Sequence, residues 1–188
     1  MSNYGRTKFF AEKLISEYSK LYNLNYAILR YFNVVGADYK NRVGQINGNT
    51  LFKTISKNII NNKLQVNVYG KNYNTKDGTC LRDYIDINDL SEIHLLLIKK
   101  LKSNKFLELN CGYNKAYSVK EVINFFSKII KKKIKINFKK KRKGDSHAIY
   151  CNNSKLKIIF PGWKRKYNIY NSINSSLLWE KSIKSKYK

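Results

Sequence analysis

The sequence alternates between helical and strand-like hydrophobic patterns, and this alternation constrains the fold more than any other feature. Apolar side chains recur at helical spacing from Arg6 to about Tyr22. Residues 26–32 then form a short apolar run that is typical of a buried strand. The alternation continues along the chain without an internal repeat. Alternating helices and strands of this kind predict an α/β body.

The remaining elements follow approximately from the same patterns. Ser118 is followed three residues later by Glu121, a pairing that predicts a capped helix N-terminus. Asn88 or Asp89 is expected to cap a helix that ends near residue 100. The pattern further predicts helices over residues 51–61, over 118–130 and from about 167. Extended segments are expected over 66–69, 81–87, 106–110 and 134–138, and a loop is expected over 34–48.

The start of the chain lacks a feature that nucleotide-binding α/β domains share. Such a domain normally opens with a strand, a glycine-rich turn and a helix. This sequence opens directly into a helix, and neither G-x-G-x-x-G nor G-x-x-G-x-x-G occurs in it. Either the protein binds no dinucleotide, or the first half of such a domain is absent.

A net charge of +26 raises the question of nucleic-acid binding. Only six of the 38 basic residues are arginine, and the lysines are scattered along the whole chain. The densest run, residues 131–143, contains the alternating segment 134–138, so its lysines are expected to form one solvated face. The pattern predicts no nucleic-acid partner, and a basic nucleic-acid-binding protein is the least favoured alternative.

The cysteines and the hydropathy limit the compartment. Cys80, Cys111 and Cys151 are widely spaced, odd in number and form no C-x-x-C pattern, so we expect free thiols and no metal site. No apolar run of about 18 residues occurs, and residues 1–8 contain no apolar core of a signal peptide. We therefore expect a cytoplasmic chain with no membrane partner.

Tyr4 and Lys8 form the first pattern with chemical potential. Residues four positions apart share one face of a helix. An ammonium group beside a phenol favours the phenolate, so such a pair can act as an activated tyrosine base. The pattern alone is weak, because an ordinary exposed pair on a helix gives the same spacing.

Three segments carry a resemblance to a known family. Residues 3–12, NYGRTKFFAE, and residues 29–36, LRYFNVVG, resemble the Y-G-x-[ST]-K-x-x-x-E and L-R-Y-F-N-x-x-G segments of extended short-chain dehydrogenase/reductases. Residues 73–90, YNTKDGTCLRDYIDINDL, resemble the T-x-D-G-T-x-x-R-D-Y-I-H-V-x-D-L stretch of the UDP-glucose 4-epimerases. With shorter matches that continue to Trp163, the resemblance covers essentially the whole chain.

The resemblance implies an α/β fold that corresponds to the C-terminal part of an extended short-chain dehydrogenase/reductase. Residues 1–35 would be the final part of the NAD-binding Rossmann domain with the Tyr/Lys helix. Residues 36–188 would mainly form the smaller UDP-sugar domain, with segments that return to the Rossmann sheet. The glycine-rich turn lies upstream in the family, so we expect a fragment that alone neither holds NAD tightly nor turns over.

The resemblance also implies an activity and a site. The activity would be that of a UDP-glucose 4-epimerase, an isomerase that interconverts UDP-galactose and UDP-glucose through a 4-keto intermediate with bound NAD. Tyr4 would be the base at O4, Lys8 would assist it, and both would contact NAD together with Phe32. The expected substrate contacts are Asn33, Thr50, Leu51, Tyr69, Arg82, Tyr84, Val119, Arg142 and Asp145.

Arginine at positions 82 and 142 agrees with a phosphate-binding role. A planar guanidinium group binds phosphate in a bidentate way, and lysine does not. Arginine at position 30 also falls within a family motif of this lysine-rich chain. The alternative for Arg82 is a plain ion pair with the adjacent Asp83.

Several positions depart from the family pattern. Asp86 stands where the family usually has histidine, and Thr50 and Ile149 stand where some members have asparagine and tyrosine near the substrate. The sugar therefore stays open, and another nucleotide-sugar epimerase or dehydratase, or an inactive remnant, is the alternative. The expected partners are UDP-glucose and UDP-galactose, with a homodimer through the Tyr/Lys helix or a complementing N-terminal half.

Overall fold

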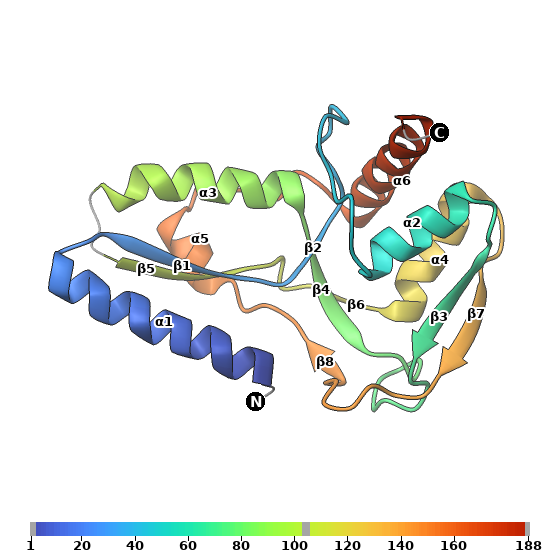
Figure 1. Cartoon of the computed structure of the whole chain (residues 1–188), viewed down its shortest axis with the longest axis horizontal. Coiled ribbons are helices and arrows are strands. Elements are labelled where there is room, and N and C mark those ends of the chain that lie inside the picture. The colour runs from blue at the N-terminus through green and yellow to red at the C-terminus, as the bar shows by residue number, and fades with distance from the viewer. Residues whose placement is uncertain (1–2, 103–105, 187–188) are drawn as a thin grey trace.

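The computed structural model describes residues 3–102 and 106–186, which form an α/β structure with helices around three small sheets (Figure 1). The elements in chain order are α1 (Asn3–Tyr22), β1 (Tyr26–Tyr31), β2 (Asn33–Val35), α2 (Leu51–Ile60), β3 (Gln65–Tyr69), β4 (Leu81–Asp86), α3 (Ile87–Leu101), β5 (Phe106–Cys111), β6 (Ala116–Ser118), α4 (Val119–Ile130), β7 (Lys135–Lys139), β8 (Ala148–Ile149), α5 (Ser154–Ile159) and α6 (Ile169–Lys186).

The first sheet consists of β1 and β5, which run parallel in a register that pairs Tyr26 with Phe106 and Tyr31 with Cys111. In Figure 1, α3 runs along one side of this pair of strands and α1 along the other. Ile93 of α3 and Leu109 of β5 are fully buried in the core between helix and sheet. The apolar run that predicted a strand is therefore the strand that joins α1 to the rest of the fold.

Strand β4 is the centre of the second sheet. It pairs parallel with β2 and β8 and antiparallel with β6. The third sheet is the parallel pair β3 and β7. Between these sheets and helices α2, α4 and α6 lies a second core, in which the ring of Phe52 contacts those of Tyr84 and Phe126 at centroid distances of 5.4 and 5.3 Å.

The structure corrects several boundaries that the sequence patterns predicted. Residues 33–35, partly assigned to a loop, form β2, and Asp86 rather than Asn88 or Asp89 caps α3, because its side chain accepts a hydrogen bond from the Asn88 N–H. The elements β6, β8 and α5 were not predicted, since two to six residues are too few to show a period. The Ser118–Glu121 capping box is confirmed.

Helix α1 is unusual because it buries none of its side chains. Its apolar residues nevertheless include Phe10, Leu14, Tyr18 and Leu21, which are between 56% and 76% exposed. These positions lie on one side of the helix by their spacing. In the described part of the chain, no helix is long and apolar enough to cross a membrane.

Candidate functional site

A pocket of about 560 Å³ lies between the second and third sheets, and we call it the polar pocket. Its walls come from β2, β3, β4, the starts of α2 and α4, and the loop after β7. All of the expected substrate contacts line it: Asn33, Thr50, Leu51, Tyr69, Arg82, Tyr84, Val119, Arg142 and Asp145. The fold thus brings together residues that are up to 112 positions apart in the sequence, from Asn33 to Asp145.

Strand register and helix caps place these side chains. Asn33 at the start of β2 is the register partner of Tyr84 in β4, so the two lie side by side. Thr50 caps α2 by accepting a hydrogen bond from the Lys53 N–H, which places Leu51 in the first turn of α2. Val119 begins α4 directly after its capping residue. Strand pairing and helix starts thus place five of the nine expected contacts: Asn33, Thr50, Leu51, Tyr84 and Val119.

The Asp77-Gly78-Thr79 segment, part of the most specific motif, builds the loop in front of β4. Asp77 accepts hydrogen bonds from the N–H and hydroxyl of Thr79 at 2.8 and 2.6 Å, and another from the hydroxyl of Ser118. Gly78 has φ +77°, and a Cβ there would lie 2.1 Å from the carbonyl oxygen of Lys71. The segment therefore ties the start of α4 to the start of β4, and only glycine fits at its centre.

Arg82 pairs with Asp145 and not with its neighbour Asp83. Its guanidinium group donates to the Asp145 carboxylate and, at 3.0 Å, to the carbonyl oxygen of Ser146. Asp83 is fully buried, and it accepts from three backbone N–H groups, those of Tyr113, Lys115 and Cys151. The alternative expectation, an ion pair of Arg82 with Asp83, is therefore wrong, because Arg82 pairs with Asp145.

Tyr73 supports the same carboxylate from the far side. Its hydroxyl donates to Asp145 Oδ2 at 3.2 Å, and the Lys141 ammonium lies 4.2 Å from its ring centroid. Burial, together with the negative charge of Asp145, raises the pKa of Tyr73 to about 12. Tyr73 is therefore a neutral donor at physiological pH, and it holds Asp145 in place.

Arg142 stacks on the ring of Tyr69, with its guanidinium carbon 4.0 Å from the ring centroid. Among the described residues it makes no ion pair. Stacking leaves the edge of a guanidinium group free to donate hydrogen bonds. Arg142 and Arg82 therefore give the polar pocket two cationic groups, of which one has no carboxylate partner.

Sequence reasoning missed several polar residues of the pocket. Asn67 and Asn137 face each other in the register of β3 and β7, and both line it. The other residues missed are Asn49, Thr54, Asn58, Gln65 and Cys80. The alternation of polar and apolar side chains in both strands was a signal for this face.

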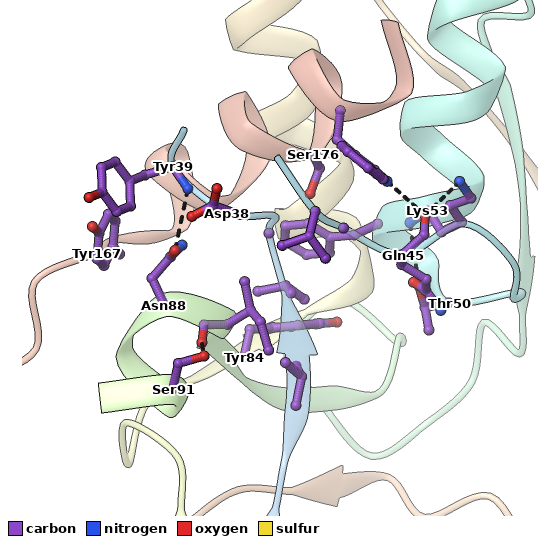
Figure 2. A pocket seen from close by; sticks show the side chains of 18 of the residues that line it. Asp38, Tyr39, Gln45, Thr50, Lys53, Tyr84, Asn88, Ser91, Tyr167 and Ser176 are labelled. Carbon is purple, nitrogen blue, oxygen red and sulfur yellow. Dashed lines mark hydrogen bonds between the residues drawn. The ribbon is translucent and has the colours of Figure 1, made fainter. Parts of the chain in front are cut away.

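A second cavity of about 1020 Å³, which we call the wide pocket, lies between the loop 36–45 and helices α2, α3 and α6 (Figure 2). It shares a wall with the polar pocket that consists of Asn33, Thr50, Leu51 and Tyr84. The hydroxyl of Ser56 is buried at its lining and has no hydrogen-bond partner among the described residues. No motif in the sequence predicted this cavity.

Tyr4, Lys8 and Phe32 line neither pocket. The Lys8 ammonium lies 5.4 Å from the centroid of the Tyr4 ring, and Tyr4 is 72% exposed. Since α1 runs antiparallel to the following β1, its first turns lie near the carboxyl end of β1, where Phe32 and Asn33 follow. Open-sheet α/β proteins bind ligands at this end of the strands.

Arg30 has a structural contact and lies outside both pockets. It donates two hydrogen bonds to the Glu12 carboxylate, at 2.7 and 2.6 Å, and thereby ties β1 to α1. The arrangement holds the pKa of Glu12 below its ordinary value. Arg30 therefore orients the helix that carries Tyr4 and Lys8.

The site contains no cation-binding cluster within the described ranges. No group of three or more His, Cys, Asp or Glu side chains in residues 3–102 and 106–186 is arranged to hold a metal ion. All three cysteines are buried and free. Hydroxyl, amide, guanidinium and carboxylate groups line the polar pocket.

Parallel strand pairs and a polar pocket that contains two arginines define an α/β protein with a candidate ligand site. The chain belongs to the NAD dependent epimerase/dehydratase family, whose model matches residues 1–112.

Curated relatives agree with this assignment. The UDP-glucose 4-epimerase of Rhizobium leguminosarum bv. trifolii is 32% identical over 180 residues, which are 94% of this chain and 54% of the relative. The UDP-arabinose 4-epimerase 1 of Arabidopsis thaliana is 34% identical over 191 residues, 98% of this chain and 45% of the relative. The chain spans about half the length of the curated relatives that it matches.

Solved structures show the same fold. The UDP-glucose 4-epimerase from Bifidobacterium longum, in complex with NAD+ and UDP, superposes with a TM-score of 0.86 at 33% identity, and the match covers 95% of this chain and 54% of that one. The enzyme from Stenotrophomonas maltophila, with bound NAD and formylated UDP-arabinopyranose, gives 0.89 at 27% identity and covers 99% and 56%. The predicted fold class, an extended short-chain dehydrogenase/reductase matched over about half its length, is confirmed.

Proposed function

We propose that this chain is the part of a UDP-glucose 4-epimerase that binds the UDP-sugar and carries the catalytic tyrosine–lysine pair. The observation that carries the proposal is the polar pocket, which gathers all nine expected substrate contacts in one cavity. Relatives that are 31% to 32% identical to the chain over the aligned residues are named UDP-glucose 4-epimerases.

The chemistry of the polar pocket suits a nucleoside diphosphate. Arg82 and Arg142 supply donors for the diphosphate, because guanidinium groups bind phosphate oxygens in a bidentate way. Asp145 is placed to accept hydrogen bonds from ribose hydroxyls. Tyr69, on whose ring Arg142 stacks, offers the ligand an aromatic edge. The amides of Asn67 and Asn137 offer both donors and acceptors to a base.

Tyr4 and Lys8 have separate roles in the proposed reaction. Tyr4 removes the proton from the O4 hydroxyl of the sugar and returns it after the 4-keto intermediate has turned. Lys8 supplies a positive charge beside this phenol, with its ammonium 5.4 Å from the centroid of the Tyr4 ring. NAD, when bound, supplies the acceptor and donor of the hydride at C4.

The described residues fit only one end of NAD. The exposed Tyr4 hydroxyl and the Lys8 ammonium can hydrogen-bond a ribose. A pyrophosphate, in contrast, needs a helix N-terminus after a glycine-rich turn, and none of the described helices begins after one. The chain would therefore hold the nicotinamide ribose, while another α/β unit binds the rest.

Two surfaces support the presence of such a complementing unit. In the described structure, β1 pairs with a strand on one side only, that of β5. The apolar side of α1, with Phe10, Leu14 and Tyr18, is exposed next to it. An additional strand along β1 and a helix against α1 would satisfy the strand edge and bury that apolar side. A second copy of this chain at α1 is the other partner that we propose.

The test is to join the chain to the NAD-binding half of a related UDP-glucose 4-epimerase and to measure the conversion of UDP-galactose to UDP-glucose. The joined protein is expected to turn over and the chain alone is expected to be inactive. Tyr4→Phe in the joined protein should lower kcat by about 10²- to 10⁴-fold, since it removes the proton-transfer group. Tyr170→Phe, on α6 and outside both pockets, is the control.

Two results would contradict the proposal. One is a joined protein that binds NAD but converts none of the UDP-sugars. The other is stoichiometric NAD in the purified chain, because the described residues would then hold the whole cofactor. Sedimentation of the chain and of the joined protein separates the second copy from the complementing unit as the partner of α1.

The similarity to the UDP-arabinose 4-epimerase favours a second substrate. That relative is 34% identical to the chain, slightly more than the UDP-glucose 4-epimerase from Rhizobium leguminosarum bv. trifolii. Assays of the joined protein with UDP-arabinose and UDP-galactose, compared by kcat/KM, decide between the two sugars.

A further inference from the structure

Helix α6 is joined to the start of α2 by a buried ion pair. Lys53, in the first turn of α2, pairs with Glu180 of α6, and each side chain is only 7% exposed. The two residues lie 127 positions apart in the sequence. When one partner of such a pair is removed, the other is left as an uncompensated buried charge. The pair therefore fixes how the start of α2 lies against α6.

The same lysine also anchors the loop before α2. Its ammonium donates to the carbonyl oxygen of Gln45 at 2.9 Å (Figure 2). The indole N–H of Trp179, which lies in α6 like Glu180, donates to the same oxygen at 3.0 Å. Gly44 lies against the Trp179 ring, and a Cβ at this position would come within 2.7 Å of it. Trp179 of α6 and Lys53 of α2 thus hold the loop at positions 44 and 45.

From Gln45 the connection reaches the polar pocket. The hydroxyl of Thr50 donates to the side-chain oxygen of Gln45 at 3.0 Å. Thr50 caps α2, and both Thr50 and Leu51 line the polar pocket. No described residue of α6 lines that pocket. Helix α6 acts on this wall of the pocket through the contacts of Lys53 and Gln45.

We propose that Lys53 and Glu180 are positioning residues for the sugar nucleotide. Together they hold the Gln45 carbonyl and the first turn of α2, and thereby set where Thr50 and Leu51 meet the ligand. The proposal rests on the proposed function, because it assigns a role to the same polar pocket. It adds the C-terminal helix to the parts of the chain that determine substrate affinity.

The first test measures UDP affinity by calorimetry in the full chain. Glu180→Gln keeps the shape of the side chain but leaves the Lys53 ammonium without its counter-charge, and UDP should bind about tenfold more weakly because the pocket wall is displaced. Lys184→Met is the matched control. It removes another contact between α6 and α2, a hydrogen bond of 2.8 Å to the carbonyl of Ile60, which lines neither pocket. UDP affinity in the control should stay within about twofold of wild type.

A double variant separates positioning from stability. Lys53→Met with Glu180→Leu replaces the ion pair by apolar side chains, a change that often leaves stability unaltered. The Gln45 carbonyl loses its lysine donor in this double variant. We expect a wild-type melting temperature together with weakened UDP binding, a combination that a purely structural role does not produce.

A second measurement tests the positioning role of Lys53 and Glu180 without ligand. Amide hydrogen exchange of the free protein should accelerate at residues 44–51 in Glu180→Gln and stay unchanged there in Lys184→Met. Unchanged exchange at these residues overturns the positioning role, as does equal UDP affinity of wild type and Glu180→Gln. Failure of wild type to bind UDP contradicts the proposed function instead, while the exchange comparison still decides whether Lys53 and Glu180 hold the loop.

Discussion

Arg82 donates a hydrogen bond to the carboxylate of Asp145 inside the polar pocket, and the two side chains are 12% and 25% exposed. Asp145 also accepts a hydrogen bond from the Tyr73 hydroxyl. The carboxylate that orients the Arg82 guanidinium group is therefore itself fixed by a second contact. This arrangement orients Arg82 before a ligand arrives, which lowers the entropy that binding would otherwise cost.

Replacing Arg82 by lysine tests whether the guanidinium group is needed. Lysine keeps the charge but cannot bind a diphosphate in a bidentate way, so UDP affinity should fall by about 10- to 100-fold. Arg165→Lys is the control, because Arg165 stacks on Tyr113 and lines neither pocket. Equal affinity of Arg82→Lys and wild type in calorimetric titrations would remove Arg82 from the site.

Arg142 is expected to contribute a salt-dependent part of the affinity. Its guanidinium group is stacked on Tyr69 and makes no ion pair among the described residues, so a phosphate is its natural counter-ion. Arg142→Ala should weaken UDP binding by about tenfold at low salt, and by less at high salt. Lys143→Ala, an exposed neighbour, should change little. Titrations at two salt concentrations check this, and similar losses in both variants would contradict a specific role.

Asp86 is expected to make the free energy of unfolding depend on pH. It caps α3 and accepts from the Ser172 hydroxyl at 2.6 Å, and burial raises its pKa above the ordinary 3.8. The folded state therefore keeps the proton more readily than the unfolded state. The contribution of Asp86 to stability is greatest below about pH 3.8 and falls as the pH rises through the folded pKa.

Urea unfolding of wild type and Asp86→Asn at several pH values measures this contribution. Asparagine is also a good N-cap but carries no charge. The difference in unfolding free energy between wild type and variant should shift in favour of the variant as the pH rises from about 3.8. Asp86→Ala should cost about 1 kcal/mol or more at every pH through loss of the cap. A difference that does not vary with pH would contradict the burial effect.

The three cysteines should be nearly inert in the folded chain. Burial raises the pKa values of Cys111 and Cys151 from 9.0 to about 12, and it also raises that of Cys80. At pH 8 a rise of three units lowers the thiolate population about a thousandfold. Alkylation at pH 8, followed by mass spectrometry, should label the native chain slowly and the urea-unfolded chain quickly. Fast labelling of Cys111 or Cys151 in the native chain would show that this core is open.

The local motifs predicted residues that gather in the polar pocket. The segments around Arg82 and Ser118 are contiguous patterns, and the contacts expected there, Arg82, Tyr84 and Val119, line one pocket. Helices with a clear period, such as α2 and α4, were also predicted within a few residues. The boundaries failed where an element is too short to show a period, as in β6 and β8.

Long-range pairings were not accessible from the sequence. Lys53 and Glu180 are separated by 127 positions, and neither belongs to a pattern that names its partner. The same holds for Asp145 as partner of Arg82 and for Asp83 as acceptor of three backbone N–H groups. Only the folded backbone brings such residues together, and the wide pocket between α3 and α6 arises in the same way.

The most direct measurement is a calorimetric titration of the chain with UDP, since all residues expected to hold the nucleotide lie within it. The account predicts saturable binding of one UDP per chain, lost when Arg82 and Arg142 are both replaced by alanine. The absence of binding, or binding that survives the double replacement, would contradict the assignment of the polar pocket to the sugar nucleotide.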